Sequence, residues 1–123
     1  MKILAPKLHG IIDYVSVAGL LLAPTIFGLQ GIAATVAYLL AGIHLVMTVL
    51  TDFPLGAVKL VPLKLHGLVE IVVGVSLLVL PWALASMVEL GANGRYFYSA
   101  FGAVLIAVWA VTDYAASPAA ATA

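Results

Sequence analysis

The chain has 123 residues, a formal net charge of zero and only 8% charged side chains, whereas 65% of its residues are hydrophobic and its mean hydropathy is +1.24. An ordinary soluble domain carries about 25% charged residues, so this composition argues against a water-soluble fold, and the zero net charge gives no electrostatic footprint for nucleic acid. The absence of cysteine excludes disulfides, thiolate metal sites and thiol catalysis.

Four apolar stretches are each close to the length that crosses a bilayer as a helix, which takes about 20 residues. In chain order they run from about 8 to 27, 31 to 50, 65 to 88 and 96 to 111. Strands of a membrane barrel would alternate apolar and polar residues, and these stretches show no such alternation. We therefore predict an all-α, integral membrane four-helix bundle in a single domain, followed by a disordered tail at 116–123.

An internal repeat divides this domain into two units, at about 6–54 and 62–115. The sequence PKLHGIID at 6–13 recurs as PLKLHGLVE at 62–70, and TDF at 51–53 recurs as TDY at 112–114. Each unit contains two membrane crossings, so both copies start from the same side of the bilayer. The sequence therefore predicts two tandem transmembrane hairpins, as parallel repeats related by a pseudo-twofold axis along the membrane normal.

This topology gathers the charged residues at one face of the membrane. Glu89 and Arg95 are predicted at the opposite face, and the residues predicted at the charged face are Lys2, Lys7, Asp13, Asp52, Lys59, Lys64, Glu70 and Asp113. Lysine and arginine in short loops are more frequent on the cytoplasmic side. We therefore predict that both termini are cytoplasmic.

Three features of the repeat resemble those of a known family. The third predicted helix contains Pro81-Trp82, the first contains Pro24 near its far end, and both units carry the K-x-H-G and T-D landmarks. With these features the chain resembles the SPW repeat family of small bacterial membrane proteins, over nearly its whole length to Tyr114. The serine of the naming motif is absent, since Leu80 precedes Pro81. The resemblance implies a multi-pass protein of the bacterial inner membrane and implies no activity.

Ionisable residues recur at a spacing of four within the predicted helices, which places them on one helix face. His9 is followed by Asp13, His66 by Glu70, and His44 begins a column that Thr48 and Asp52 continue. Charged groups inside a membrane are paired or face a hydrated interior, so we expect these side chains to point inward. The predicted polar cluster consists of Lys7, His9, Asp13, His44, Asp52, Lys64, His66, Glu70 and Asp113.

Two classes of function remain open for this cluster. In the favoured interpretation it pins the helices of a structural or accessory subunit, which forms a homo-oligomer or docks onto a larger membrane complex in the lipid bilayer. In the alternative, the cluster is a binding or transfer site. A small ligand or a metal such as Zn, Mn or Fe would be bound by His9, Asp13, His66 and Glu70, or haem would lie between His9 and His66. A third possibility is that His44 transfers protons or a solute. The sequence itself requires no cofactor. No nucleophile with an adjacent base can be assembled, so a catalytic role is the weaker option.

Overall fold

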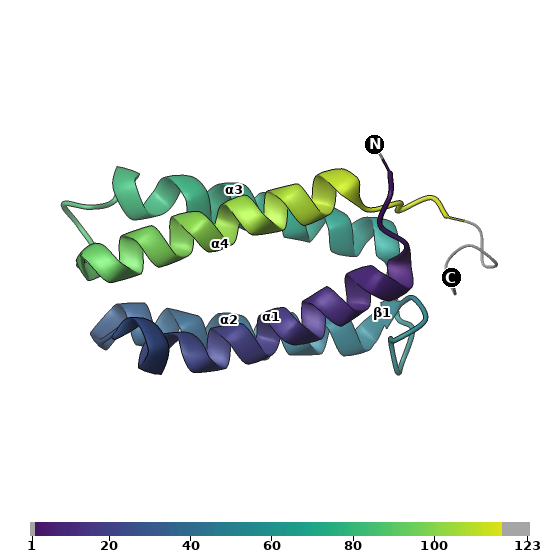
Figure 1. Cartoon of the computed structure of the whole chain (residues 1–123), viewed down its shortest axis with the longest axis horizontal. Coiled ribbons are helices and arrows are strands. Elements are labelled where there is room, and N and C mark those ends of the chain that lie inside the picture. Colours follow the sequence, from purple (N-terminus) through teal and green to yellow (C-terminus); the bar gives the residue numbers. More distant parts are fainter. Residues whose placement is uncertain (1, 117–123) are drawn as a thin grey trace.

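The protein is a bundle of four long helices, seen in a computed structural model that describes residues 2–116. Its helices are α1 (Pro6–Phe27), α2 (Gly31–Leu50), α3 (Leu63–Ala83) and α4 (Gly91–Val111). Helix α1 packs on α2 and α3 on α4, as two hairpins that lie side by side (Figure 1). All four are long and apolar enough to span a membrane. The predicted all-α membrane bundle of two hairpins is confirmed, whereas the tail beyond residue 116 lies outside the described residues.

The outer surface of the bundle consists largely of apolar side chains. Val15, Leu39, Ile43 and Leu68 are 58–65% exposed. On four helices of this length, such a surface suits the acyl chains of a lipid bilayer and not water. The chain is therefore a multi-pass membrane protein whose helices contact lipid.

The loop between the third and fourth helices differs from the prediction. Helix α3 ends at Ala83, not near residue 88, and α4 begins at Gly91, not near residue 96. The chain leaves the helix at Leu84, shortly after Pro81, and turns until Gly91, whose φ of +67° suits a glycine. The apolar composition continues through this turn, which is why hydropathy alone extends the helix too far.

Small residues allow the two helices of the second hairpin to approach closely. A Cβ atom on Gly102 would lie 2.5 Å from the backbone oxygen of Gly74, so the helix backbones are almost in contact at this crossing. Close approach through glycine is typical of helix pairs in membranes. At the loop end of the bundle away from the chain termini, a separate core forms around Ala33, Ala37 and Tyr98.

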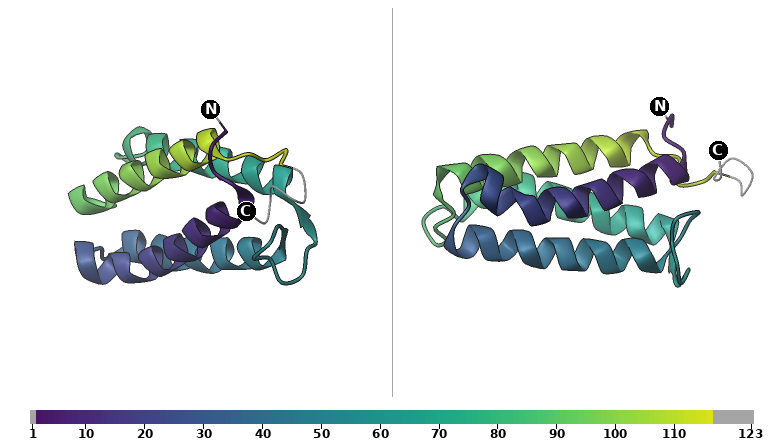
Figure 2. Two further views of the ribbon diagram at one scale, coloured as in Figure 1. Left: turned by 45° about the vertical axis from the view of Figure 1, so that its right-hand side comes forward. Right: turned by 60° about the horizontal axis from the view of Figure 1, so that its bottom comes forward.

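Short parallel backbone pairings tie the two hairpins together at the other end. Strand β1 (Thr51–Asp52) follows α2 and pairs with β2 (Val61–Pro62), which precedes α3. An equivalent bridge joins Leu4, just before α1, to Thr112, just after α4. The segment leading into each hairpin therefore lies against the last residues of the other hairpin. Both pairings are at the end of the bundle where the chain termini lie, on the right-hand side of the right panel of Figure 2.

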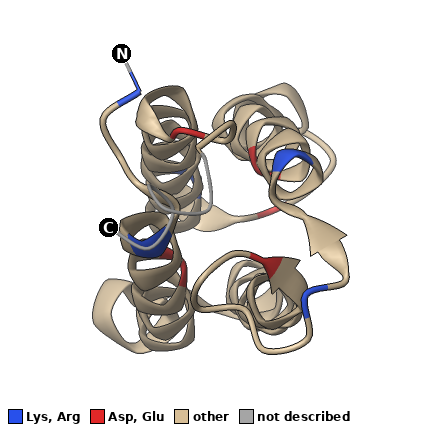
Figure 3. Cartoon of the chain, turned by 90° about the vertical axis from the view of Figure 1, so that its right-hand side faces the viewer, with Lys and Arg blue, Asp and Glu red and all other residues tan. Residues whose placement is uncertain are grey.

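The same end carries most of the charge. Lys7 and Lys64 lie in the first turns of α1 and α3, and Lys59 lies in the loop between the two short strands. Arg95 lies at the opposite end, near the start of α4. Figure 3 views the bundle from the lysine-rich end and shows basic and acidic residues around it. The structure thus agrees with the predicted one-sided charge distribution.

Candidate functional site: a buried cluster of histidines and carboxylates

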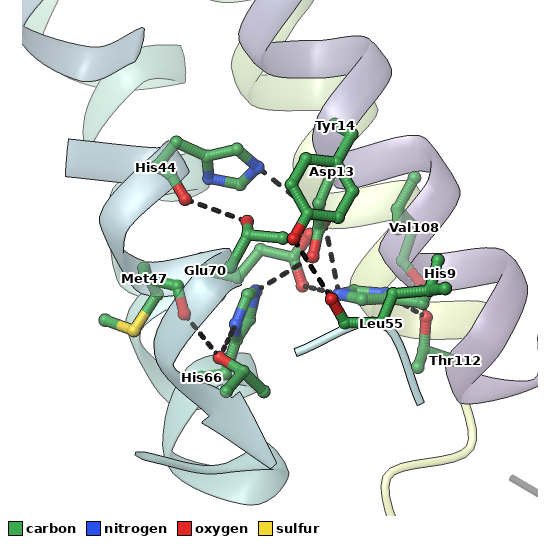
Figure 4. Close-up of polar contacts among 12 residues, drawn as sticks. His9, Asp13, Tyr14, His44, Met47, Leu55, His66, Glu70, Val108 and Thr112 are labelled. Atoms are coloured by element: carbon green, nitrogen blue, oxygen red, sulfur yellow. Dashed lines mark hydrogen bonds and ion pairs between the residues drawn. The ribbon is translucent and has the colours of Figure 1, made fainter. Parts of the chain in front are cut away.

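Five ionisable side chains from three helices converge inside the bundle near its charged end (Figure 4). Helix α1 contributes His9 and Asp13, α2 contributes His44, and α3 contributes His66 and Glu70. His9, Asp13, His66 and Glu70 are at most 4% exposed, and the His44 side chain is 17% exposed. Four of these five groups are therefore removed from solvent.

The ring nitrogens and carboxylate oxygens of this cluster face one another at similar separations. Asp13 lies at the centre, with Oδ1 3.4 Å from His9 Nε2 and 3.6 Å from His44 Nε2, and Oδ2 3.5 Å from His66 Nε2. Glu70 Oε2 lies 3.7 Å from His9 Nε2. These separations exceed the 2.7–3.2 Å of ordinary N–H···O hydrogen bonds. The groups are close neighbours that are not hydrogen-bonded to one another.

Several of these atoms are buried without a hydrogen-bond partner among the described residues. They include His9 Nε2, His44 Nε2, Asp13 Oδ2 and Glu70 Oε1. The great majority of buried polar atoms in proteins do have a partner, and each exception needs an explanation. Apart from Arg95 Nε near the other end of the bundle, the exceptions among the described residues belong to this cluster, so they need a common explanation.

Thr112, immediately after α4, determines which nitrogen of His9 carries the proton. Its hydroxyl donates to the backbone oxygen of Val108 at 2.7 Å. A hydroxyl has only one proton to donate, so the contact of 2.9 Å between Thr112 Oγ1 and His9 Nδ1 requires the histidine to be the donor. We assign the proton to Nδ1 from this network, which leaves a lone pair on Nε2 of the neutral ring, directed into the cluster.

The other repeat reproduces this arrangement. Thr51, immediately after α2, donates its hydroxyl to the backbone oxygen of Met47 at 2.6 Å and lies 2.8 Å from His66 Nδ1. His66 is therefore also protonated on Nδ1 and directs the Nε2 lone pair toward the cluster. Both threonines are fully buried. Each histidine is thus held, by a threonine of the opposite hairpin, in the tautomer that leaves Nε2 free to bind a cation.

The two repeats differ in how their carboxylates are supported. The Tyr114 hydroxyl donates to Glu70 Oε2 at 2.6 Å, and burial raises the pKa of Tyr114, so the phenol stays protonated and remains a donor. Phe53 occupies the equivalent place after α2 and has no hydroxyl to offer Asp13. Asp13 instead contacts His44, whose counterpart on α4 is Leu105. The backbone arrangement is twofold, but the chemistry around the two carboxylates is not.

The spacing of the converging atoms fits a metal ion. His9, His66 and Glu70 each offer a ligand atom, and the three atoms lie within 4.8 Å of one another. Two ligand atoms at about 2.1 Å from a tetrahedral metal lie about 3.4 Å apart. Glu70 Oε2 lies 3.7 Å from His9 Nε2, and oxygens of Asp13 lie 3.4–3.5 Å from the two histidine Nε2 atoms, so these separations are close to that spacing.

Four of the nine residues predicted for the polar cluster lie outside it. Lys7 and Lys64 are exposed on the first turns of their helices. Asp52 is also exposed and lies 3.7 Å from Lys59. Asp113 is half-buried and accepts a hydrogen bond from the backbone N–H of Ala115. The structure therefore brings together the histidines, Asp13 and Glu70, and places the other charged groups around the rim.

The predicted column from His44 through Thr48 to Asp52 is not formed. Helix α2 ends at Leu50, so Asp52 belongs to strand β1 and no longer follows the helical spacing. The Thr48 hydroxyl donates to the backbone oxygen of His44, and the His44 ring faces Asp13 on the neighbouring helix. A transfer path along α2 therefore loses its outer acidic group.

Haem between His9 and His66 does not fit this geometry. The two imidazole rings lie edge to face with centroids 5.4 Å apart. A porphyrin placed between them would also have to displace Asp13, which lies close to both Nε2 atoms. The arrangement suits a single small cation and leaves no space for a macrocycle.

The sequence interpretation missed three residues that support the cluster, namely Thr51, Thr112 and Tyr114. Their signal was present, because TDF and TDY close the two units as repeated polar residues beyond the helix ends. Assigning them to the site would have required knowing that the end of each hairpin lies against the start of the other.

Comparisons of the chain with protein-family models, with curated proteins and with solved structures find no match. The resemblance to the SPW repeat family therefore stays a prediction. The function has to be inferred from the chemistry of the chain's own residues.

Proposed function

We propose that this multi-pass membrane protein binds a divalent first-row transition-metal ion through His9, His66 and Glu70, with Asp13 as a further ligand. The observation that carries this proposal is that ligand atoms of His9, His66 and Glu70 lie buried within 4.8 Å of one another, with Asp13 oxygens 3.4–3.5 Å from both imidazoles. In the assigned tautomers the Nε2 atoms of His9 and His66 carry no proton. A cation bound by His9, His66 and Glu70 would give these atoms a common partner, and Asp13 lies close enough to both histidines to complete its coordination.

The charge of the cluster supports a divalent ion. When both are ionised, as metal ligation requires, the carboxylates of Asp13 and Glu70 contribute two negative charges at positions that are at most 4% exposed. Uncompensated charge is costly inside a protein and within a membrane. None of the lysines among the described residues forms an ion pair with either carboxylate. A divalent cation neutralises both.

The supporting contacts favour a binding site over a purely structural role in which these side chains hold the helices together. A structural polar network is stabilising when its members are hydrogen-bonded to one another, whereas here the central atoms are 3.4–3.7 Å apart. Hydrogen bonds are found instead on the outer side, from His9 to Thr112, from His66 to Thr51 and from Tyr114 to Glu70. Metal-ligating histidines are typically oriented through their second nitrogen in this way.

The donor set indicates the class of metal. Imidazole and carboxylate ligands suit zinc, manganese and iron, while the absence of thiolate argues against a site built for copper(I). We further propose that the site faces the cytoplasm of a bacterial cell from the inner membrane. The lysines at this end, with Arg95 alone at the other, support that orientation.

Metal analysis of the purified protein tests the proposal. The wild type, purified without chelator and then equilibrated with zinc, manganese or ferrous iron, is expected to retain one of them stoichiometrically. The double variant His9→Ala/His66→Ala is expected to lose it, and the control Lys7→Ala/Lys64→Ala, altered at the exposed rim, is expected to keep it.

Two results would count against metal binding. One is a folded wild type that retains none of the three metals, and the other is a double variant whose metal content equals that of the wild type. A metal-free, folded protein that co-purifies stoichiometrically with another membrane protein would instead support the accessory-subunit interpretation.

A further inference from the structure

A small cavity adjoins the cluster between α2 and α3. Its volume is about 50 Å³, and His44, His66 and Glu70 line one part of it. The rest of the wall is apolar, formed by Leu40, Ile43, Met47, Val69, Val73 and Leu105. Two of the proposed metal ligands, His66 and Glu70, therefore border a space that protein atoms do not fill.

We propose that this cavity holds a small uncharged molecule, of the size of dioxygen or nitric oxide, which coordinates the metal at a position that the protein leaves open. The inference rests on the metal site proposed above. It adds that the site is open to an exogenous ligand on the side of this cavity, toward α2 and α3.

The size of the cavity sets the size of the molecule. A single water needs about 10–15 Å³ of such a space, so a cavity of about 50 Å³ accommodates a diatomic molecule and is small for an organic substrate. Ligand pockets typically combine apolar walls with a few polar groups. This cavity has that composition at a small scale.

The coordination chemistry leaves room for such a ligand. Two histidines and one carboxylate with open positions form the ligand set with which non-haem ferrous iron binds oxygen. His9, His66 and Glu70 provide this set, and Asp13 occupies a further position close to both histidines. An ion that accepts five or six ligands keeps at least one position for an exogenous molecule.

The surroundings of the cavity indicate where the molecule comes from. Ile43 lines the cavity and is also 61% exposed on the lipid-facing surface of α2. On the other hairpin, Leu105 stands where the first hairpin has His44, which makes that wall apolar. A small apolar molecule dissolved in the bilayer core can therefore approach the metal without crossing a charged region.

Nitric oxide on the ferrous protein tests the inference. Wild type loaded anaerobically with ferrous iron in detergent is expected to form an iron–nitrosyl complex, visible by electron paramagnetic resonance. Val73→Phe places an aromatic ring in the cavity. This variant is expected to keep its iron and to bind nitric oxide with an affinity lower by about tenfold or more. Val72→Phe is the matched control, because Val72 is 58% exposed on the outer face of the same helix.

Further measurements keep the test decisive if Val73→Phe does not fold. Leu40→Phe fills the cavity from the opposite wall, and Leu39→Phe, at a position 60% exposed, is its control. In the wild type itself, tert-butyl isocyanide is expected to be too large to bind the iron.

The outcomes separate this inference from the proposed function. Iron-loaded wild type that forms no nitrosyl complex overturns the inference and leaves metal binding intact. Unchanged nitric oxide binding in both cavity-filling variants, or coordination of tert-butyl isocyanide, overturns it as well. A wild type that binds no iron or other metal overturns the proposed function itself.

Discussion

The imidazole of His9 is held by the hydroxyl of Thr112, a residue 103 positions away at the end of the other hairpin. Thr51 and His66 form the reciprocal contact. Each histidine is thus oriented by a threonine that belongs to the opposite unit of the repeat. The cluster therefore reaches its final geometry only when the two hairpins dock, which would couple the proposed metal binding to assembly of the bundle.

Removing a threonine hydroxyl should weaken metal binding. Thr112→Val and Thr51→Val each free the Nδ1 proton of one histidine, and loss of such outer contacts typically costs 10–100-fold in metal affinity. The dissociation constant for zinc, measured in detergent by competition with a chromogenic chelator, is expected to rise by this factor. Thr35→Val is the control, since Thr35 also donates to a helix carbonyl but is exposed and remote from the cluster. Equal affinities in all three variants would show that the threonines do not orient the ligands.

Removing the Tyr114 hydroxyl should have a smaller effect of the same sign. Tyr114→Phe reproduces the residue that the first repeat has at Phe53 and deletes the hydrogen bond to Glu70. We expect zinc affinity to fall by about tenfold, with Tyr96→Phe, at a position 67% exposed, as the control. An affinity equal to that of the wild type would mean that Glu70 is positioned without this contact.

His44 is expected to be dispensable for retention of the metal. His44→Leu gives the first repeat the residue that the second has at Leu105. The substitution removes a contact with Asp13 but leaves the three mutually close ligand residues, His9, His66 and Glu70, in place. The variant should keep a stoichiometric ion, whereas His9→Leu and His66→Leu should lose it, as measured by elemental analysis. Loss of the metal in His44→Leu would make His44 a principal ligand.

Metal affinity should fall as the pH is lowered. Imidazole and carboxylate must be unprotonated at the ligating atom, so the metal competes with protons and releases them when it binds. The zinc dissociation constant is expected to increase as the pH is lowered from about 8 to about 5, because protons compete with the metal for the ligating atoms. Calorimetry in buffers with different ionisation enthalpies should show proton release, and affinity that is independent of pH would argue against histidine ligands.

The glycine crossing between α3 and α4 provides a stability test independent of the metal. Gly102→Ala places a Cβ atom 2.5 Å from the Gly74 oxygen and 2.8 Å from the Leu78 nitrogen, so the helices must separate, at a cost of about 1–3 kcal/mol. Gly42→Ala is the control, because nothing lies within 4 Å of its Cβ position. Thermal unfolding in detergent should show a lower midpoint for Gly102→Ala and an unchanged or higher one for Gly42→Ala. Equal midpoints would contradict the close crossing.

Much of the fold follows from local patterns in the sequence. Helix length and hydropathy predict the four spans, and the repeat of K-x-H-G and T-D predicts two equivalent hairpins. The end of α3 was missed because the chain remains apolar through the turn after Pro81. Hydropathy reports where a segment can lie in a membrane and does not report where its helical hydrogen bonds stop.

The site was predictable only in part, for a related reason. Spacing of four residues within one helix identifies His9 with Asp13 and His66 with Glu70. The contacts with Thr51 and Thr112 join different hairpins, and no spacing along the chain encodes them. The same limit explains Asp52, which continues the helical spacing from His44 although α2 has already ended at Leu50.

X-ray absorption spectroscopy of the zinc-loaded protein tests the central claim most directly. The account predicts a shell of nitrogen and oxygen ligands close to about 2.0–2.2 Å, with the outer-shell scattering of two imidazoles, and loss of that scattering in His9→Ala/His66→Ala. A spectrum without imidazole scattering, or one that the double variant leaves unchanged, would contradict a metal site at this cluster.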